Sequence, residues 1–576
     1  MNSDPDDHHD GDQPCPDLPE ECWEMILTSL NDHHHRQFES LSLISHRFLS
    51  QTNHLRQNFT ITPQAHLQLL STFPKFSIRF PNIKTLIFPP SCHDLDSVLT
   101  QIANSNLSIT HLDISKQTNF PVMGIQQLGR KKGNLKSLRC SNVNSLQDCD
   151  LVSIGYAFPG LEEVDISYSD SGRVTDSGVM ELGSKLANSR QINLSGNHFI
   201  SDKSILALAS SCLHLSEISI FDCDFITEDG IGLFIRQCRN LKSIRINDIL
   251  FPGIVQSLSF ANARKLSEIH LSESYISNEL LGLIGDACLP LKKLSLSNSC
   301  GFTFEGISVL LSKNQSIDSL DLEGANFLSD ESIVDLCKYL LSLRSVNLNS
   351  CSKLTTYGFC TLTNECPLLQ ESQMEKTNLG VEFCDTEFVQ NRHVKHLYLA
   401  NNNNLNDETL KKIMTSYPNL ETLDLSCCVR LTGEVITESL RNLPKIRVLK
   451  VNWIRNFDSF KIDIDLPNLE MVQAKGTRLD DEAVAEISRK CSRLLNLDLQ
   501  ACSRVTTDGV KEAVVNCKLL REINLKGCDS VMTNIVAWMV FSRPSLRKII
   551  LSCSSIPKTE QKNFFLRHGC LVCDGS

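Results

Sequence analysis

Leucine-type residues return about every 26 positions between residue 83 and residue 551. In each unit they alternate with polar residues over a short stretch, as at Leu215, Ile218 and Ile220. This alternation predicts a short strand with one buried face. Counting the middle apolar position of each stretch from Leu86 to Ile549 gives about nineteen units. A unit of this length cannot bury its apolar face alone, so the spacing predicts a stack of repeats.

The second part of each unit predicts a helix. In the unit that begins at Leu215, oxygen-rich side chains at 227–229 satisfy the free N–H groups of a helix start. Ile231, Phe234 and Ile235 follow at helical spacing. Strand and helix in alternation produce parallel strands, and helices need more room than strands. We therefore predict an α/β fold, a curved, right-handed solenoid with parallel strands on the concave face. Such a long face suits a protein ligand better than a small molecule.

Residues 17–60 do not follow the repeat. Their apolar residues have helical spacing, with Trp23, Ile26, Leu27 and Leu30 on one side of a first helix. We predict a small three-helix unit that has little core of its own. It must therefore pack against the first repeats, bind a partner, or both. The predicted organisation is a disordered lead (1–16), this helical unit (17–60), a linker or first cap (61–80), the repeats (81–555) and a C-terminal cap or tail (556–576).

Two units depart from the pattern, and the unit from Val164 to Ile192, which spans 28 residues, has its extra length in a predicted loop at 167–174. The unit from Leu449 to Val472 spans only 23 residues, which leaves little room for a helix. We expect Trp453, Phe457 and Phe460 to fill the missing helix volume. The alternative is an aromatic anchor for a ligand, because aromatic residues dominate binding hot spots.

The charge pattern bears on the partner. The net charge of −11 argues against a nucleic-acid binder, which normally has a basic face. The sequence contains no run of 18 apolar residues, so we expect no membrane span. The start of the chain lacks a secretory signal, so we expect a protein of the nucleus, the cytoplasm or both. Charges on the predicted concave face indicate a ligand with separate basic and acidic stretches. They are acidic early in the stack and basic late: Glu217, Asp321 and Glu323, then Lys450, Lys475, Lys526 and Lys548.

The chain has 24 cysteines, which we expect to be reduced because no secretory signal is present. Many recur at equivalent repeat positions, and such repetition indicates one structural role rather than catalysis. Those positions are Cys223, Cys351, Cys428, Cys502 and Cys528 after the strands, and Cys212, Cys238, Cys288, Cys366, Cys491 and Cys517 before them. Cys570 and Cys573 lack a second pair at zinc spacing. We find no catalytic motif, and we predict no cofactor, no metal and no enzymatic activity.

Two resemblances follow from these motifs. The pattern L-x-x-L-x-L-x-x-C followed by T-D-x-G, clearest at 343–368 and 494–519, resembles the cysteine-containing leucine-rich repeats. The Leu18-Pro19-Glu20 start, the Ile26-Leu27-x-x-Leu30 helix and the stretch at 41–48 resemble an F-box. An F-box directly before such repeats is a specific pairing, found in plant and animal substrate receptors, and the length and repeat number favour a plant protein.

The resemblance implies a function. An F-box docks on a Skp-type adaptor in a cullin-based ubiquitin ligase, and the repeats hold a protein substrate for ubiquitination and proteasomal degradation. Leu18, Pro19, Ile26, Leu30 and Ile44 match positions that face the adaptor or fix the helices. Two alternatives stay open: a ligand-dependent receptor of the plant hormone type, and a binding scaffold that acts without ubiquitin. The chain lacks the extended loops and basic inositol-phosphate site of the hormone receptors.

Overall fold

The computed structural model describes residues 18–33, 41–42, 44–61, 69–169, 173–251, 260, 262–381, 388–532, 534–552 and 557–574. The chain divides into two units, 1–226 and 227–576, and each is described by itself. None of the helices in these described ranges has the length and apolar character needed to cross a membrane.

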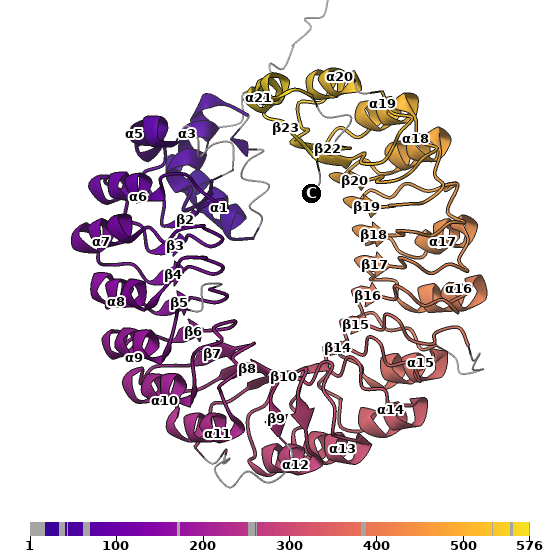
Figure 1. Cartoon of the computed structure of the whole chain (residues 1–576). Helices are drawn as coiled ribbons and strands as arrows, with labels where there is room; N and C mark the ends of the chain where they lie inside the picture. Colours follow the sequence, from indigo (N-terminus) through magenta and orange to yellow (C-terminus); the bar gives the residue numbers. More distant parts are fainter. Residues whose placement is uncertain are drawn as a thin grey trace, which may run out of the picture. The chain divides into compact units, whose positions relative to one another are not determined.

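In its described residues, the first unit begins with helices and continues as strands alternating with helices (Figure 1). Its helices are α1 (Glu20–His33), α3 (His46–Leu55), α5 (Leu69–Arg79), α6 (Leu95–Asn104), α7 (Val122–Lys131), α8 (Asp148–Ala157), α9 (Asp176–Lys185) and α10 (Asp202–Ser211). Its strands are β1 (Asn58–Thr60), β2 (Thr85–Ile87), β3 (His111–Asp113), β4 (Ser137–Arg139), β5 (Glu163–Asp165), β6 (Gln191–Asn193) and β7 (Glu217–Ile220).

The second unit continues the same alternation. Its helices are α11 (Glu228–Gln237), α12 (Asn278–Asp286), α13 (Phe304–Lys313), α14 (Asp330–Cys337), α15 (Thr356–Glu365), α16 (Asp407–Ser416), α17 (Gly433–Leu440), α18 (Asp481–Lys490), α19 (Thr507–Asn516), α20 (Ile535–Ser542) and α21 (Thr559–Arg567). Its strands are β8 (Ser243–Asn247), β9 (Leu250–Phe251), β10 (Glu268–Ser272), β11 (Tyr275–Ile276), β12 (Lys293–Ser295), β13 (Ser319–Asp321), β14 (Ser345–Asn347), β15 (Glu371–Gln373), β16 (His396–Tyr398), β17 (Thr422–Asp424), β18 (Val448–Lys450), β19 (Met471–Gln473), β20 (Asn496–Asp498), β21 (Glu522–Asn524), β22 (Lys548–Leu551) and β23 (Leu571–Asp574).

The strands within each unit pair in parallel, and the apolar middle residues stand directly opposite one another. In the first unit Leu86 pairs with Leu112, and Leu112 with Leu138. In the second, Leu294 pairs with Leu320, and Leu497 with Ile523. These residues are almost fully buried. The α/β fold and the strand register predicted from the 26-residue spacing are therefore confirmed, because a fixed repeat length forces equivalent positions into register.

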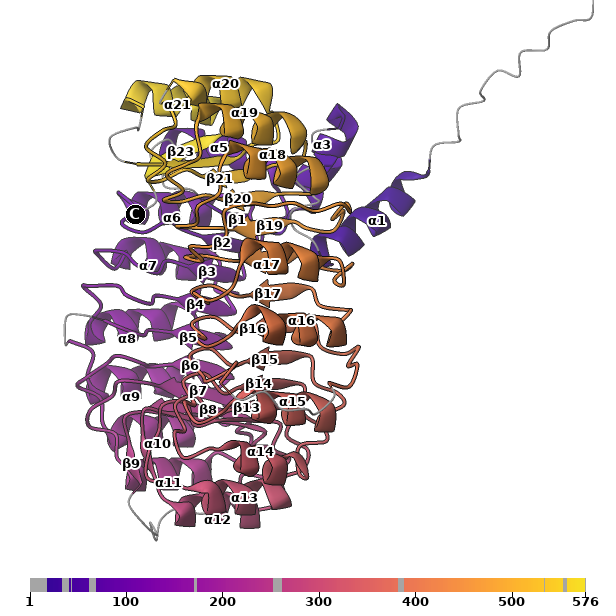
Figure 2. The same ribbon diagram turned by 90° about the vertical axis from the view of Figure 1, so that its right-hand side faces the viewer.

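Helices and strands form two rows in each unit. Figure 1 shows the helices along the outer side of each curved row and the strands along the inner side, and Figure 2 shows the strands stacked one above another. The outer row covers one face of the strands. The other face carries polar residues such as Glu163 and Asp165, which are partly exposed beside buried Val164.

A polar ladder links the helix starts. Thr355 caps α15, and the Asp330 carboxylate at the start of α14 accepts hydrogen bonds from the N–H and the hydroxyl of Thr355, at 2.9 and 2.5 Å. The Gly358 N–H donates to the same carboxylate at 3.1 Å, and a side chain at Gly358 would collide with it. In the T-D-x-G motif, the threonine caps its own helix, and the aspartate accepts hydrogen bonds from the cap of the next helix. The glycine leaves space for the aspartate of the preceding repeat. Asp148, Asp176, Asp407 and Asp481 hold the next cap in the same way.

The recurring cysteines form a second ladder. The thiol of Cys351 donates to the Leu322 carbonyl of the preceding repeat at 3.4 Å. Four others bond the equivalent carbonyl: Cys223, Cys428, Cys502 and Cys528. Burial raises the pKa of the Cys351 thiol to about 12, so it stays protonated and unreactive. Among the cysteines before the strands, Cys288 differs from the expected role, because it is exposed rather than packed in a turn.

The short unit between β18 and β19 has no helix in residues 451–470. Phe457 and Phe460 are buried there, with ring centroids 6.4 Å apart. They fill the space of the missing helix as expected. The expectation was wrong for Trp453, which is 51% exposed. Trp453 lies in the turn directly after β18, in a left-handed conformation.

The ladder also extends beyond the span predicted from spacing. β1 pairs with β2, so the strands begin within residues assigned from sequence to the helical unit. At the other end, β23 pairs with β22 after α21. One interior position breaks the apolar row: Ser372, in the middle of β15, is fully buried and its hydroxyl has no partner.

Candidate functional site

The helical segment is formed by α1 and α3. Trp23 of α1 packs edge-on against Phe48 of α3, with ring centroids 5.0 Å apart, and Leu27 of α1 is fully buried. The Ser45 hydroxyl caps α3 by accepting a hydrogen bond from the Phe48 N–H at 3.2 Å. One side of α1 is thereby fixed, and Figure 2 shows α1 extending away from the row of repeats in the first unit.

Several large apolar side chains of this segment face solvent. Leu18 is 43% exposed, Ile26 41% and Ile44 64%, and Pro19 is also exposed. The side chain of Leu30 lies outside the described residues. Met25, which the sequence pattern did not single out, is 71% exposed, and only its place opposite the Trp23 and Leu27 side of the helix could have revealed it. Large apolar side chains that are exposed within one short segment are candidates for a surface that docks another protein. We name Leu18, Met25, Ile26 and Ile44 the helical docking surface.

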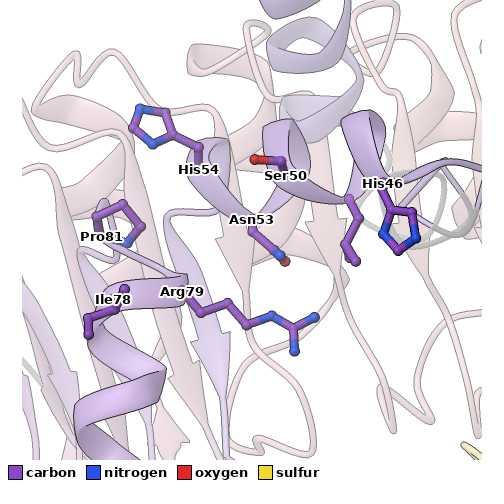
Figure 3. A pocket seen from close by; sticks show the side chains of 8 residues that line it. His46, Ser50, Asn53, His54, Ile78, Arg79 and Pro81 are labelled. Carbon is purple, nitrogen blue, oxygen red and sulfur yellow. The ribbon is translucent and has the colours of Figure 1, made fainter.

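A groove lies beside this surface, between α3 and α5. It has a volume of about 350 Å³ and is lined by His46, Leu49, Ser50, Asn53, His54, Ile78, Arg79 and Pro81. Figure 3 shows Asn53 pointing toward the Arg79 side chain. The groove is open to solvent and mostly polar, unlike the enclosed apolar pockets that bury small ligands.

The strand face carries the other predicted site residues. Glu217 lies on β7 of the first unit. In the second unit Asp321 and Lys450 lie on β13 and β18, and Lys548 lies on β22. Glu323, Lys475 and Lys526 follow β13, β19 and β21. All seven side chains are partly exposed, as expected for the alternate positions of a half-buried strand.

Three of the four late lysines form ion pairs within the chain, which the expectation of a basic stretch did not include. Lys450 lies 3.3 Å from Asp424, Lys475 lies 3.3 Å from Asp498, and Lys548 lies 2.8 Å from Glu522. Each partner is on an adjacent strand. The sequence analysis missed it because Asp498 and Glu522 stand in register with the lysines only when the strands pair.

The acidic residues on β13–β15 have no such partner. Among the described residues, no lysine, arginine or histidine forms an ion pair with Asp321, Glu323, Glu371 or Glu375. Their hydrogen bonds come from neutral groups: Ser295 donates to Asp321 at 2.9 Å, and Asn347 donates to Glu323 at 3.2 Å. Burial raises the pKa of Asp321, and the charge of Glu323 adds to this effect. Burial also raises the pKa of Glu375, helped by repulsion from Asp424.

Trp453 stands at the edge of the strand face. Its φ of 61° is left-handed, a conformation that costs a bulky residue on the order of 1 kcal/mol. The neighbouring repeat has Gly476 at the same position, where a side chain would collide with the indole ring. The Trp453 N–H donates to the Lys475 carbonyl at 2.6 Å. The indole is thus held flat against the next turn with half of its surface open, which fits the hypothesis of an aromatic anchor.

The described residues hold no group of three or more His, Cys, Asp or Glu side chains that could bind a metal ion. The thiols of Cys570 and Cys573, from the C-x-x-C pair, lie on and next to β23. Burial raises the pKa of both, most for Cys570, to about 12.

Comparison with known proteins gives a partial match. No family model matches the chain. The chain is similar to F-box/LRR-repeat protein 4 from Bos taurus, with 26% identity over 189 residues, which are 30% of this chain and 29% of the bovine protein. The match therefore spans less than a third of that relative. Among solved structures, Rad7 in the yeast Rad7–Elc1 complex aligns with a TM-score of 0.44 and 18% identity, over 73% of this chain and 96% of the other. The TLR13–ssRNA13 complex aligns with a TM-score of 0.42 and 14% identity, over 90% of this chain and 83% of that chain.

Proposed function

We propose that this chain is the substrate-recognition subunit of a Skp–cullin–F-box ubiquitin ligase. The observation that carries the proposal is the helical docking surface, with Leu18, Ile26 and Ile44 exposed on a segment outside the repeats, whereas the leucine-type residues of the repeat strands are buried. The similarity to an F-box/LRR-repeat protein supports it. The regular thiol ladder supports a place in the cysteine-containing subclass of these repeats.

The energetics of docking favour this role. Burying a leucine or isoleucine side chain contributes roughly 1.5–3 kcal/mol, so three such residues can offset the cost of association. Residues already exposed in the folded chain need no rearrangement before they bind. The adaptor partner would be a Skp-type protein, which in turn links the chain to a cullin.

The chain itself would do no chemistry. It would hold a protein substrate on the strand face near the site of ubiquitin transfer, which raises the effective concentration of the reacting groups. The product would be the ubiquitinated substrate, which the proteasome would then degrade. These steps would take place in the nucleus, the cytoplasm or both. No cofactor or metal is part of this proposal.

Adaptor capture tests the proposal. The full chain is mixed with a purified Skp-type adaptor, and complex formation is followed by size-exclusion chromatography and calorimetry. We expect a one-to-one complex that is lost when Leu18, Pro19 and Ile26 are changed to alanine. A matched control changes three exposed apolar residues on repeat helices, Met123, Met180 and Val309, to alanine. This control should retain adaptor binding.

Two outcomes would contradict the proposal. If the intact chain fails to bind the adaptor, the chain is a binding scaffold that acts without ubiquitin. If the Leu18/Pro19/Ile26 variant binds as well as the Met123/Met180/Val309 variant, the helical docking surface is not the adaptor site. Circular dichroism of each variant distinguishes loss of binding from loss of folding.

A further inference from the structure

The strand face from β13 to β17 differs in charge from the strands that follow it. The face is formed by the alternate residues of these five strands and the residue that follows each of them on the same side. Most of them are partly exposed, whereas Ala400, Thr422 and Asp424 are buried. It carries Asp321, Glu323, Glu371, Glu375 and Asp424, and its other residues are neutral or histidine. No lysine or arginine lies on this face within the five strands, all of which are fully described. We name it the acidic strand face.

One cation from the next strand shows how this face holds a positive charge. Lys450 of β18 lies 3.3 Å from the Asp424 carboxylate and 5.5 Å from the centre of the Tyr398 ring. Both contacts stabilise an ammonium group, by ion pairing and by cation–π attraction. The chain thereby neutralises the edge of the acidic strand face, and the positive charges of Lys450 and Lys376 also act on Glu375. Asp321, Glu323 and Glu371 form no ion pair with a described residue.

The centre is poorly compensated from within. Glu371 accepts a hydrogen bond from the neutral Gln373 amide at 2.9 Å, and Asp321 and Glu323 likewise accept from neutral side chains. These carboxylates are partly buried, and water therefore screens their repulsion less than at an open surface. A bound positive charge would relieve this repulsion. A single metal ion does not fit, because no three potential ligands converge in the described part of the chain.

We propose that the acidic strand face docks an extended lysine- or arginine-rich segment of the partner protein. Naming that partner the substrate rests on the function proposed above, whereas the binding chemistry does not. Parallel strands lie about 4.8 Å apart, so five strands span roughly 20 Å, the length of about six residues of extended peptide. Complementary charge along such a path orients the segment and accelerates its association.

Peptide binding to the full chain tests this inference. The probe is a fluorescein-labelled ten-residue peptide of alternating lysine and serine. The control peptide has glutamate in place of each lysine. Fluorescence anisotropy should show binding of the lysine peptide and none of the glutamate peptide. Raising the salt concentration should weaken the binding, because exposed charges are screened beyond about 10 Å at 0.1 M ionic strength.

The decisive variant removes charge without changing size: Asp321→Asn with Glu323→Gln, Glu371→Gln and Glu375→Gln. We expect it to bind the lysine peptide roughly tenfold or more weakly. The matched control makes the same change in net charge on exposed residues of four helices, Glu279→Gln with Glu434→Gln, Glu482→Gln and Glu512→Gln. It should bind like the unmodified chain. Thermal unfolding of both variants checks that the fold is retained.

The outcomes separate this inference from the proposed function. Three results would overturn the inference. The chain binds the lysine and glutamate peptides equally, it binds neither peptide, or the two quadruple variants bind the lysine peptide equally. The variant of the acidic strand face should still capture the Skp-type adaptor, since its substitutions lie far from α1 in sequence and in another unit. Adaptor capture with no peptide binding would refute only the acidic strand face, and the reverse result would refute only the adaptor role.

Discussion

The helical segment and the repeat ladder bury their apolar residues to very different extents. In the ladder, each strand places a leucine-type residue against its neighbours on both sides, as Leu497 lies between Val472 and Ile523. In the helical segment, Leu27 is fully buried, whereas Ile26, the adjacent residue of the same helix, is 41% exposed. The ladder completes its core from its own repeats. The helical segment has too few elements to do so, and a second protein can complete it.

The largest expected effect comes from the interior of the ladder. Leu497→Ala should lower the local free energy of unfolding by about 2–5 kcal/mol, because it leaves a cavity that the packed neighbours cannot fill. Repeat arrays can unfold in parts, so hydrogen exchange of the amides in β19–β21 is the suitable measurement. Unchanged protection there would contradict the account of the core.

A pair of glycines tests the link between neighbouring helix starts. Gly358→Ala should destabilise the chain by about 1–3 kcal/mol, because the new methyl group would collide with the Asp330 carboxylate. Gly282→Ala is the matched control in α12, where a Cβ would meet no atom within 4 Å. It should stabilise the helix by about 0.5–1 kcal/mol. Thermal unfolding compares the two, and equal shifts would contradict the ladder.

The pH dependence of stability tests the same ladder through Asp176. Burial acts to raise the pKa of this carboxyl, but hydrogen bonds from Ser201 and Ser204 outweigh it and hold the pKa below its usual value. The ionised form is therefore stabilised by folding. This contribution is complete above the unfolded-state pKa of about 3.9 and is lost as the pH falls through the lower pKa of the folded chain.

The Asp176→Ala variant should accordingly be less stable than the unmodified chain by about 1–2 kcal/mol at neutral pH. The difference should begin to shrink below about pH 4, where the carboxyl of the unfolded chain becomes protonated, and shrink further as the pH approaches the lower pKa of the folded chain. Denaturant unfolding at pH 7 and pH 3 measures both values. A difference that stays constant between these pH values would rule out a role for the ionised carboxylate.

The smallest effect on stability is expected at the helical docking surface. Leu18→Ala and Ile26→Ala together should change the free energy of unfolding by less than about 0.5 kcal/mol, because exposed side chains contribute few contacts. Leu27→Ala, one position along the same helix, should cost about 2–5 kcal/mol. Hydrogen exchange in α1 distinguishes the two. Comparable losses of protection would remove the contrast between an outward and an inward side of this helix.

Regular features of the fold were predictable because they repeat. The strand register follows from the spacing of Leu112, Leu138 and Val164, and the missing helix follows from the 23-residue unit that ends at Val472. The role of Phe457 and Phe460 was predictable as well, since apolar residues must fill the vacated space. Trp453 was not, because its direction depends on a left-handed turn and on the absence of a side chain at Gly476.

The candidate site also has features that the sequence predicted and features that it did not. Its residues could be placed on the strand face from their alternation, but their electrostatic state depends on which strands are neighbours. Lys475 and Asp498 are 23 positions apart in the chain and 3.3 Å apart in space. The repeat, the register and the helical start of the chain could be read from residue spacing, because each of them depends on local sequence. Which charges remain unpaired and which apolar side chains remain exposed required the folded structure, because pairing and burial depend on contacts between distant residues.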